Sequence, residues 1–405
     1  MKNQITENRL EDRTINHDAI AVDVEPWTDP VDGEDLLDEL SALLKRFVVL
    51  PKWGAEALPL WILHTHAFQL RDITAYVGVE SPEKRCGKTT LLTLASQLVC
   101  RPVIASNISP PAFFRVIEEV RPTLLIDEAD TFLAGNEELR GILNSGCRKA
   151  AAFVVRVTSQ AEGVGQLTTF STWCPKMIAA IGRLPNTLGD RCILIRMERK
   201  MPNDECERLR NLDMGAMQRK CARFVLDHAA EIVAARPAIP RSLNDRAADT
   251  WEPLLALADL AGGQWPELAR RAAEGLTAAT QENNPIGSLL LDIFVVFASE
   301  KKDRLFTRTL VEALNERGDR PWTDMMNGKG ITDRWLSRQL RPYGISPRAF
   351  RIGGELGKGY MQNDCMETFR RYISRSDMEA LKAECKFAHE EGRMTNGEGQ
   401  MTKKA

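Results

Sequence analysis

The stretch "SPEKRCGKTT" occupies residues 81–90, and it decides how the surrounding chain folds. Phosphate-binding loops follow the pattern G-x-x-x-x-G-K-[ST], whose last three positions are filled here by Gly87, Lys88 and Thr89. Pro82 stands where the first glycine of the pattern is expected. The stretch is therefore either a phosphate-binding loop with one substitution or a basic turn that contains these three residues.

The segments on both sides favour the phosphate-binding loop. "ITAYVGVES" at 73–81 is a β-branched and aromatic run that indicates a buried strand, and "KTTLLTLASQLVC" at 88–100 has the apolar spacing of a helix. A strand that feeds a helix through a tight turn presents backbone N–H groups and the positive end of the helix dipole to an anion. Pro82 lies at the start of the loop rather than around the phosphate, so its substitution is tolerable.

Each residue type in this loop has a separate predicted task. Gly87 lets the backbone approach the phosphates, and Lys88 would reach the β and γ oxygens of ATP. The hydroxyl of Thr89 would bind Mg²⁺, and Thr90 completes the predicted nucleotide-binding set. The substrate expected from this loop is ATP, with Mg²⁺ as the cofactor.

A second motif lies about 40 residues later. "TLLIDEAD" at 123–130 places Asp127 and Glu128 at the end of an apolar run that predicts a strand. Two adjacent carboxylates at the end of a buried strand are costly unless a cation is bound there. We therefore expect Asp127 to hold Mg²⁺ and Glu128 to polarise the attacking water. The alternative is an acidic cap at the start of a helix.

A third motif, "IGRLPNTLGDRCILIRM" at 181–197, joins the two final strands expected in the sheet. Arg191 stands just before the last of them, on the edge that would face the γ-phosphate of a neighbouring subunit in a ring. Its guanidinium would stabilise negative charge in the transition state. The alternative is a surface arginine that caps a strand.

Two further sites are expected to contact the nucleotide or the attacking water. Arg183 and Asn186 occupy the region of a polar sensor, although Gly182 stands where an asparagine is more usual. Arg246, in "LNDRAADTWEPLL" at 243–255, opens a helix and would touch the γ-phosphate bound by its own chain. An ordinary intramolecular salt bridge is an equally good interpretation of Arg246.

Two segments are candidates for contact with DNA, through phosphate contacts that do not depend on sequence. The first is a hairpin at 148–171, with Arg148, Lys149 and Arg156 near its base. A hairpin that faces solvent or another subunit is the alternative. The second lies in the C-terminal part, where two amphipathic helices are followed by a glycine-rich hairpin, and the second helix with this hairpin resembles a winged helix. Its basic residues are Arg334, Arg338 and Arg341 on the second helix and Arg348, Arg351 and Lys358 on the hairpin. Winged helices also serve as protein-contact modules, which is the alternative.

Strand-like and helix-like segments alternate between residues 71 and 202, which predicts an α/β fold with a largely parallel sheet. After about residue 203 the pattern is helical. The predicted parts are a loosely ordered arm (1–34), a helical N-terminal region (35–70), an AAA+-type P-loop core (71–202), a helical lid (203–282), a winged-helix-like domain (286–375) and a polar tail (376–405).

Composition excludes some classes of protein. The chain has 405 residues, with 54 basic and 56 acidic residues, so the global charge indicates no nucleic-acid partner. No run reaches the roughly 18 apolar residues of a membrane span, and the polar first residues do not have the apolar stretch expected of a signal peptide. Nine cysteines without C-x-x-C pairs predict reduced thiols in the cytoplasm. His64 and His66 in "LHTH" are interpreted as packed side chains rather than metal ligands.

Taken together, the motifs resemble a known family. "SPEKRCGKTTLL", "PTLLIDEADTFL", "ELRGILNSG", "FSTWCPKMIAAIGRLPNTLGDR" and "LNDRAADTWEPLLALADLAG" look like a domain-of-unknown-function family of P-loop ATPases carried by phages, plasmids and integrative elements. The resemblance covers about residues 35–375 and implies an AAA+ ATPase with a helicase-like role. That family often forms the C-terminal half of primase–helicase-like proteins. No primase half is recognisable here, so a separate primase is a possible partner.

The leading hypothesis is a ring-forming, Mg²⁺-dependent ATPase that moves along single-stranded or forked DNA. A loader, remodeller or signalling ATPase with a protein partner uses the same nucleotide site, so the motifs do not separate the two. A DNA-binding repressor with a nucleotide-locked dimer is a third class. The basic residues of the hairpin and of the C-terminal helix are the features that discriminate among them.

Overall fold

The computed structural model describes residues 24–105, 108–133, 135–159, 165–210, 213–282, 285–317, 320–323 and 329–373. The chain divides into two compact units, residues 1–278 and 279–405. The division falls within helix α12 (Trp265–Glu282), a few residues before the predicted end of the lid at residue 282. None of the helices in the described ranges combines the length and apolar character that a membrane span requires.

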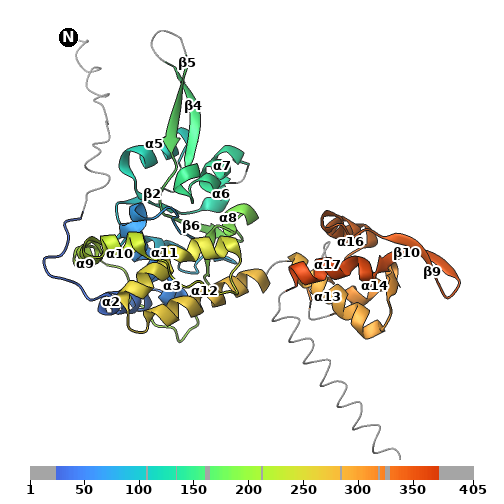
Figure 1. Ribbon diagram of the computed structural model, residues 1–405. Coiled ribbons are helices and arrows are strands. Elements are labelled where there is room, and N and C mark those ends of the chain that lie inside the picture. Colours follow the sequence, from blue (N-terminus) through green and yellow to red (C-terminus); the bar gives the residue numbers. More distant parts are fainter. Residues whose placement is uncertain are drawn as a thin grey trace, which may run out of the picture. The chain divides into compact units, whose positions relative to one another are not determined.

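A five-stranded sheet forms the centre of the first unit (Figure 1). Every neighbouring pair in it is parallel. This confirms the predicted parallel sheet and α/β class. From one edge to the other the strands are β2 (Pro102–Ala105), β3 (Thr123–Ile126), β6 (Lys176–Ile181), β1 (Tyr76–Ser81) and β7 (Cys192–Arg196).

The alternation of side chains along the strands divides the core into two layers. On β1, Val77 and Val79 pack into one apolar cluster and Tyr76 packs into the other. On β6, Met177 packs into the first of these clusters and Ile178 into the second. Because both faces are covered, the central strands are nearly continuous apolar runs, as expected for a buried parallel sheet.

One layer joins the N-terminal helices to the helices of the predicted lid. Its apolar cluster contains buried residues from every one of them, so residues 35–70 and 203–278 pack as parts of one unit. The helices are α2 (Gly33–Phe47), α3 (Gly54–Ala67), α4 (Lys88–Ser96), α9 (Gly215–Asp227), α10 (Ala229–Ala234), α11 (Asp245–Ala261) and α12. His64 lies in this layer, where its Nε2 accepts from the Ala75 N–H at 3.1 Å.

The helical pattern expected from residue 203 begins later than predicted. Residues 204–210 are not helical, and α9 starts at Gly215. The backbone N–H of Glu207 donates to the Arg46 carbonyl, and the two side chains form an ion pair at 2.6 Å. These contacts join the non-helical segment to the end of α2.

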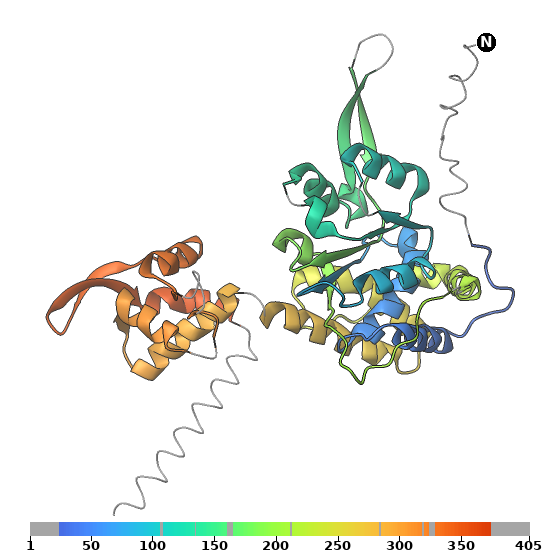
Figure 2. The ribbon, with the colours of Figure 1, turned by 180° about the vertical axis from the view of Figure 1, so that it is seen from behind.

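The opposite layer consists of short helices and carries the hairpin. The helices are α5 (Pro110–Val120), α6 (Ala129–Leu133), α7 (Glu137–Ser145) and α8 (Asn186–Gly189). The hairpin strands β4 (Phe153–Ser159) and β5 (Gly165–Ser171) pair antiparallel, as predicted, and project away from the unit (Figures 1 and 2). Phe170 packs on Phe114 of α5, with ring centroids 4.7 Å apart.

The second unit combines helices with a small antiparallel sheet of order β8-β10-β9. Its elements are α13 (Pro285–Glu300), β8 (Arg304–Phe306), α14 (Thr307–Asn315), α16 (Asp333–Leu340), β9 (Arg348–Ile352), β10 (Glu355–Met361) and α17 (Gln362–Tyr372). The fully buried Asp292 accepts a hydrogen bond from Trp322 Nε1 at 2.7 Å and pairs with Arg320 at 3.1 Å. Two helices followed by a hairpin match the predicted order of elements.

Candidate nucleotide site

The predicted phosphate loop joins β1 to α4. Gly87 caps the helix with a φ of 87°, a left-handed conformation that favours glycine. Lys88 begins the helix and is buried, with 9% of its surface exposed. Its Nζ donates to Ser81 Oγ at 2.5 Å, and Ser81 Oγ donates to the Glu83 carbonyl at 2.7 Å. Ser81 therefore ties the lysine to the start of the loop, beside Pro82.

The second motif meets the first across the carboxyl edge of the sheet. Asp127 follows β3, and its Oδ2 accepts from the Thr89 hydroxyl at 2.9 Å. The other carboxylate oxygen accepts from the backbone N–H of Glu128 at 2.9 Å. The two predicted oxygen ligands of Mg²⁺ thus lie within hydrogen-bond distance of each other, which fits the preference of this ion for one or two protein oxygens together with phosphate and water.

Glu128 lies next to these groups in an unusual backbone conformation. Its φ is 53°, in the left-handed region that residues other than glycine seldom adopt, and its side chain is exposed. The hydrogen bond from its N–H to Asp127 holds this turn. Strained backbone of this kind is concentrated at functional sites.

The end of β6 is tied to the same edge. The N–H of Gly182 donates to the Ser81 carbonyl at 2.8 Å, and the N–H of Leu184 donates to Glu80 Oε1 at 2.9 Å. Glu80 is buried on β1 and also faces Arg196 Nε at 3.4 Å. The loop that carries Arg183 is therefore fixed beside the phosphate loop, whereas Asn186 begins α8.

A cavity of about 580 Å³ adjoins the phosphate loop. Gly87, Thr89 and Thr90 line one side of it. The remaining lining comes from the end of α2, the residues after β7 and the non-helical segment before α9, and its apolar members are Phe47, Val48, Val49, Met197 and Leu209. No local sequence pattern predicts these residues as neighbours of the loop, because they come from three separate parts of the chain.

Arg191 and Arg246 lie at the amino ends of the strands, opposite the carboxyl ends that carry the phosphate loop. In the register of the strands, Tyr76 is level with Cys192, and Ser81 is level with Ile181. The five steps from Tyr76 to Ser81 span about 16 Å at the usual rise per residue. Arg191 precedes Cys192, so the length of β1 separates it from the phosphate loop of its own chain.

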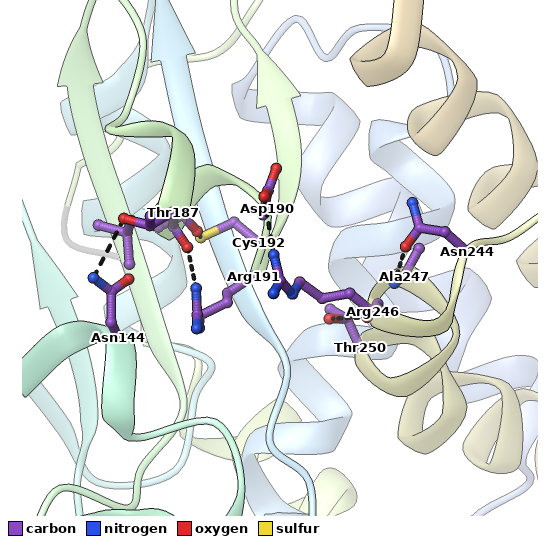
Figure 3. A network of polar contacts seen from close by, with 10 residues as sticks. Asn144, Thr187, Asp190, Arg191, Cys192, Asn244, Arg246, Ala247 and Thr250 are labelled. Carbon is purple, nitrogen blue, oxygen red and sulfur yellow. Dashed lines mark hydrogen bonds and ion pairs between the residues drawn. The ribbon is translucent and has the colours of Figure 1, made fainter. Parts of the chain in front are cut away.

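Arg246 lies in the first turn of α11 and pairs with Asp190, with Nη1 3.0 Å from Oδ2 (Figure 3). The structure therefore does not bring Arg246 to the phosphate loop of its own chain, and the salt-bridge interpretation describes its contact. Arg191 donates to the Thr187 carbonyl. Burial raises the pKa of the nearby Cys147 thiol, and the positive charges of Lys176 and of these two arginines oppose that rise.

Two of the three basic residues at the base of the hairpin have acidic partners. Arg148 pairs with Asp249 of α11, and Arg156 pairs with Glu138 at 2.6 Å. Lys149 is exposed. The outer face of the hairpin is apolar instead, and its exposed side chains are Phe153, Val155, Val157 and Leu167. Of the three basic residues predicted to contact DNA from the base of the hairpin, Arg148 and Arg156 thus have acidic partners within the chain, and the contact with DNA stays a prediction.

The second unit does present basic residues to solvent. Arg334 and Arg338 are exposed on α16 at a spacing of four residues, and Arg341 follows at its end. Arg351 and Lys358 are exposed on the hairpin, where Arg348 pairs with Asp364 at 3.3 Å. Leu336 and Leu340 face the core, so the arginines form a stripe on the opposite side of the helix.

Comparison with known proteins gives a match over the second half of the chain. A family profile described as "Protein of unknown function (DUF3631)" matches residues 196–372, which is less than half of the chain. The match agrees with the expected resemblance over the lid and the C-terminal unit. The matched residues begin after the phosphate loop, so the family match does not include the nucleotide site.

One curated relative and two solved structures are similar to this chain. An uncharacterized 28.9 kDa protein in the xis 5′ region of Saccharopolyspora erythraea is 35% identical over 163 residues, which are 39% of this chain and 59% of that protein. The chain thus spans less than two thirds of that relative. The apo C-terminal region of NrS-1 has a TM-score of 0.40 and 12% identity, covering 84% of this chain and 77% of that one. The SCCmec type IV Cch active helicase has a TM-score of 0.35 and 12% identity, covering 83% of this chain and 68% of that one. TM-scores this low support no functional argument.

Proposed function

We propose that this protein is an ATPase that converts ATP hydrolysis into movement along DNA. The observation that carries the proposal is the contact between the phosphate loop and the acidic motif, in which the Thr89 hydroxyl meets Asp127 at 2.9 Å beside the buried Lys88. Backbone N–H groups at the start of α4, the lysine and a carboxylate are the parts that phosphoryl transfer requires.

The roles of the residues follow from their positions. Lys88 would exchange its contact with Ser81 for the β and γ phosphates, and the adjoining cavity has room for the nucleoside. Mg²⁺, held by Thr89 and Asp127, would supply positive charge against the phosphates. Glu128, exposed beside Asp127, would orient the attacking water.

Completion of the site requires a second copy of the chain. Arg191 lies at the amino edge of the sheet, about 16 Å of strand from its own phosphate loop. Head-to-tail association would bring it to the loop of the next copy, and a contact of that kind closes into a ring when the rotation permits. We therefore propose a ring-forming enzyme with Arg191 acting in trans.

DNA is the proposed partner because of the second unit. Its exposed arginines on α16 and its basic hairpin match the charge and shape needed for groove and backbone contacts. The expected helicase activity also follows the family resemblance described above.

A second candidate is an ATPase that remodels or loads a protein. The hairpin favours it, because Arg148 and Arg156 are paired within the chain while Phe153, Val155 and Val157 expose an apolar face. Exposed apolar patches usually mark protein contacts.

ATP turnover with and without single-stranded DNA tests the main proposal. We expect Mg²⁺-dependent turnover that DNA stimulates, together with strand separation on a forked substrate. Lys88→Ala should reduce turnover by roughly 100-fold or more, because the loss of one preorganised charge contact typically costs 10²–10³. Full turnover in Lys88→Ala would overturn the site. Turnover without DNA stimulation or strand separation would favour the remodelling ATPase.

A further inference from the structure

The lid helix α11 is held rigidly at the amino edge of the sheet. Arg71, just before β1, pairs with Glu252 at 2.6 Å and also donates to the carbonyls of Ile232 and Ala235. The Arg71 side chain is only 9% exposed. Arg148 pairs with Asp249 one turn earlier on the same helix. Carrying the first turn of α11 to the carboxyl ends of the strands would therefore break the partly buried Arg71–Glu252 ion pair.

Arg246 stands in that first turn. Asn244 caps the helix by accepting from the Ala247 N–H at 2.9 Å, and the Arg246 carbonyl accepts from Thr250 Oγ1 at 2.9 Å. The backbone of Arg246 is therefore fixed, while its guanidinium extends to Asp190 (Figure 3). The side chains of this pair are 52% and 57% exposed, so water screens the interaction and another anion can displace the carboxylate.

Two arginines from separate elements thus lie near Asp190, with Arg246 about half exposed and Arg191 partly buried. Arg191 follows Asp190 directly in the chain. Asp190 pairs with Arg246, and no carboxylate among the described residues pairs with Arg191. A triphosphate presented by a second copy would meet both guanidinium groups. Phosphate oxygens compete well for arginine, because its planar fork forms paired, charge-assisted hydrogen bonds.

We propose that Arg246 acts on the nucleotide of the neighbouring copy, beside Arg191, and that Asp190 holds it in position until that nucleotide arrives. This inference rests on the proposed ATPase function and changes the partner expected for Arg246 from its own nucleotide to that of the neighbour. The active site is then assembled from the loop of one chain and from two arginines of the next.

Mixed variants test the arrangement. Arg246→Ala alone should retain affinity for a fluorescent ATP analogue within about twofold but lose most of its turnover, as removal of a trans-acting arginine does. Lys88→Ala supplies intact arginines without a working loop. A 1:1 mixture should recover about a quarter of wild-type turnover, because half of the loops and half of the facing arginines are intact at a head-to-tail interface.

Arg223→Ala is the matched control, since Arg223 pairs with Asp227 on α9 and lies outside the site. Its turnover should equal that of the wild type. If Arg246→Ala weakens binding of the analogue and mixing restores nothing, Arg246 acts in cis and the inference is overturned. Full turnover in Arg246→Ala overturns it as well. If the wild type itself has no Lys88-dependent turnover, the proposed function has failed instead.

Discussion

At the scale of the residue, the site depends on a few short contacts. Two short motifs predict Thr89, Asp127 and Lys88 as site residues, and the structure brings them together at the carboxyl ends of the strands. The motifs do not predict the contact of Ser81 with Lys88, because a serine at the end of a strand has no distinctive pattern. The role of each residue in hydrolysis stays a prediction.

Buried His64 should make the first unit sensitive to mild acid. Burial lowers the pKa of His64 to about 3, with a smaller contribution from Arg71, whereas an unfolded histidine titrates near 6.5. The unfolded chain therefore binds the extra proton between these values, so the free energy of unfolding falls as pH falls, by about 1.4 kcal/mol per pH unit.

Urea unfolding at pH 7 and pH 5 measures this effect. The midpoint should be lower at pH 5, and His64→Gln should show a smaller pH difference than the wild type because it removes the titrating group. Equal pH differences in the two proteins would show that His64 is not the cause.

At the scale of the element, patterns of apolar residues located the strands well. The strand before the phosphate loop, the strand of the acidic motif and the two strands of the hairpin occur at the segments where the sequence predicts them. The start of α9 was placed too early, because Glu207 and Arg46, 161 residues apart in sequence, form contacts that a local pattern does not contain.

The arginines of α16 should bind DNA phosphates. Arg334→Glu combined with Arg338→Glu should weaken binding to DNA and reduce the slope of log affinity against log salt by about 2, because each phosphate contact contributes about 0.9. The matched control is Arg371→Glu, since Arg371 is exposed on α17 of the same unit and pairs there with Glu367. Equal loss in both variants would indicate a general charge effect and not an α16 contact.

At the scale of the whole molecule, the two parts of the proposed site lie at opposite ends of the parallel strands. The phosphate loop is at the carboxyl ends and Arg191 is at the amino ends. A single chain cannot bring Arg191 to its own phosphate loop while β1 and β7 stay paired in their observed register. Turnover should therefore depend on association between copies.

Turnover per chain should rise with protein concentration and then reach a plateau. The rise should coincide with a shift to larger species in sizing experiments with ATP present. Arg191→Ala should associate in the same range yet remain at low turnover. Constant turnover per chain from dilute monomer upward would contradict assembly of the site from two copies.

The sequence alone was sufficient for features that are local along the chain. The phosphate loop is one, since a strand, a turn and a helix within 28 residues determine its shape. The acidic motif and the hairpin are others. The tertiary structure was needed for the cavity beside the loop, for the pairing of Arg148 with Asp249, and for the position of Arg246. These depend on the order of the parallel strands and on how α11 packs against them, and such long-range packing leaves no periodic pattern in the sequence.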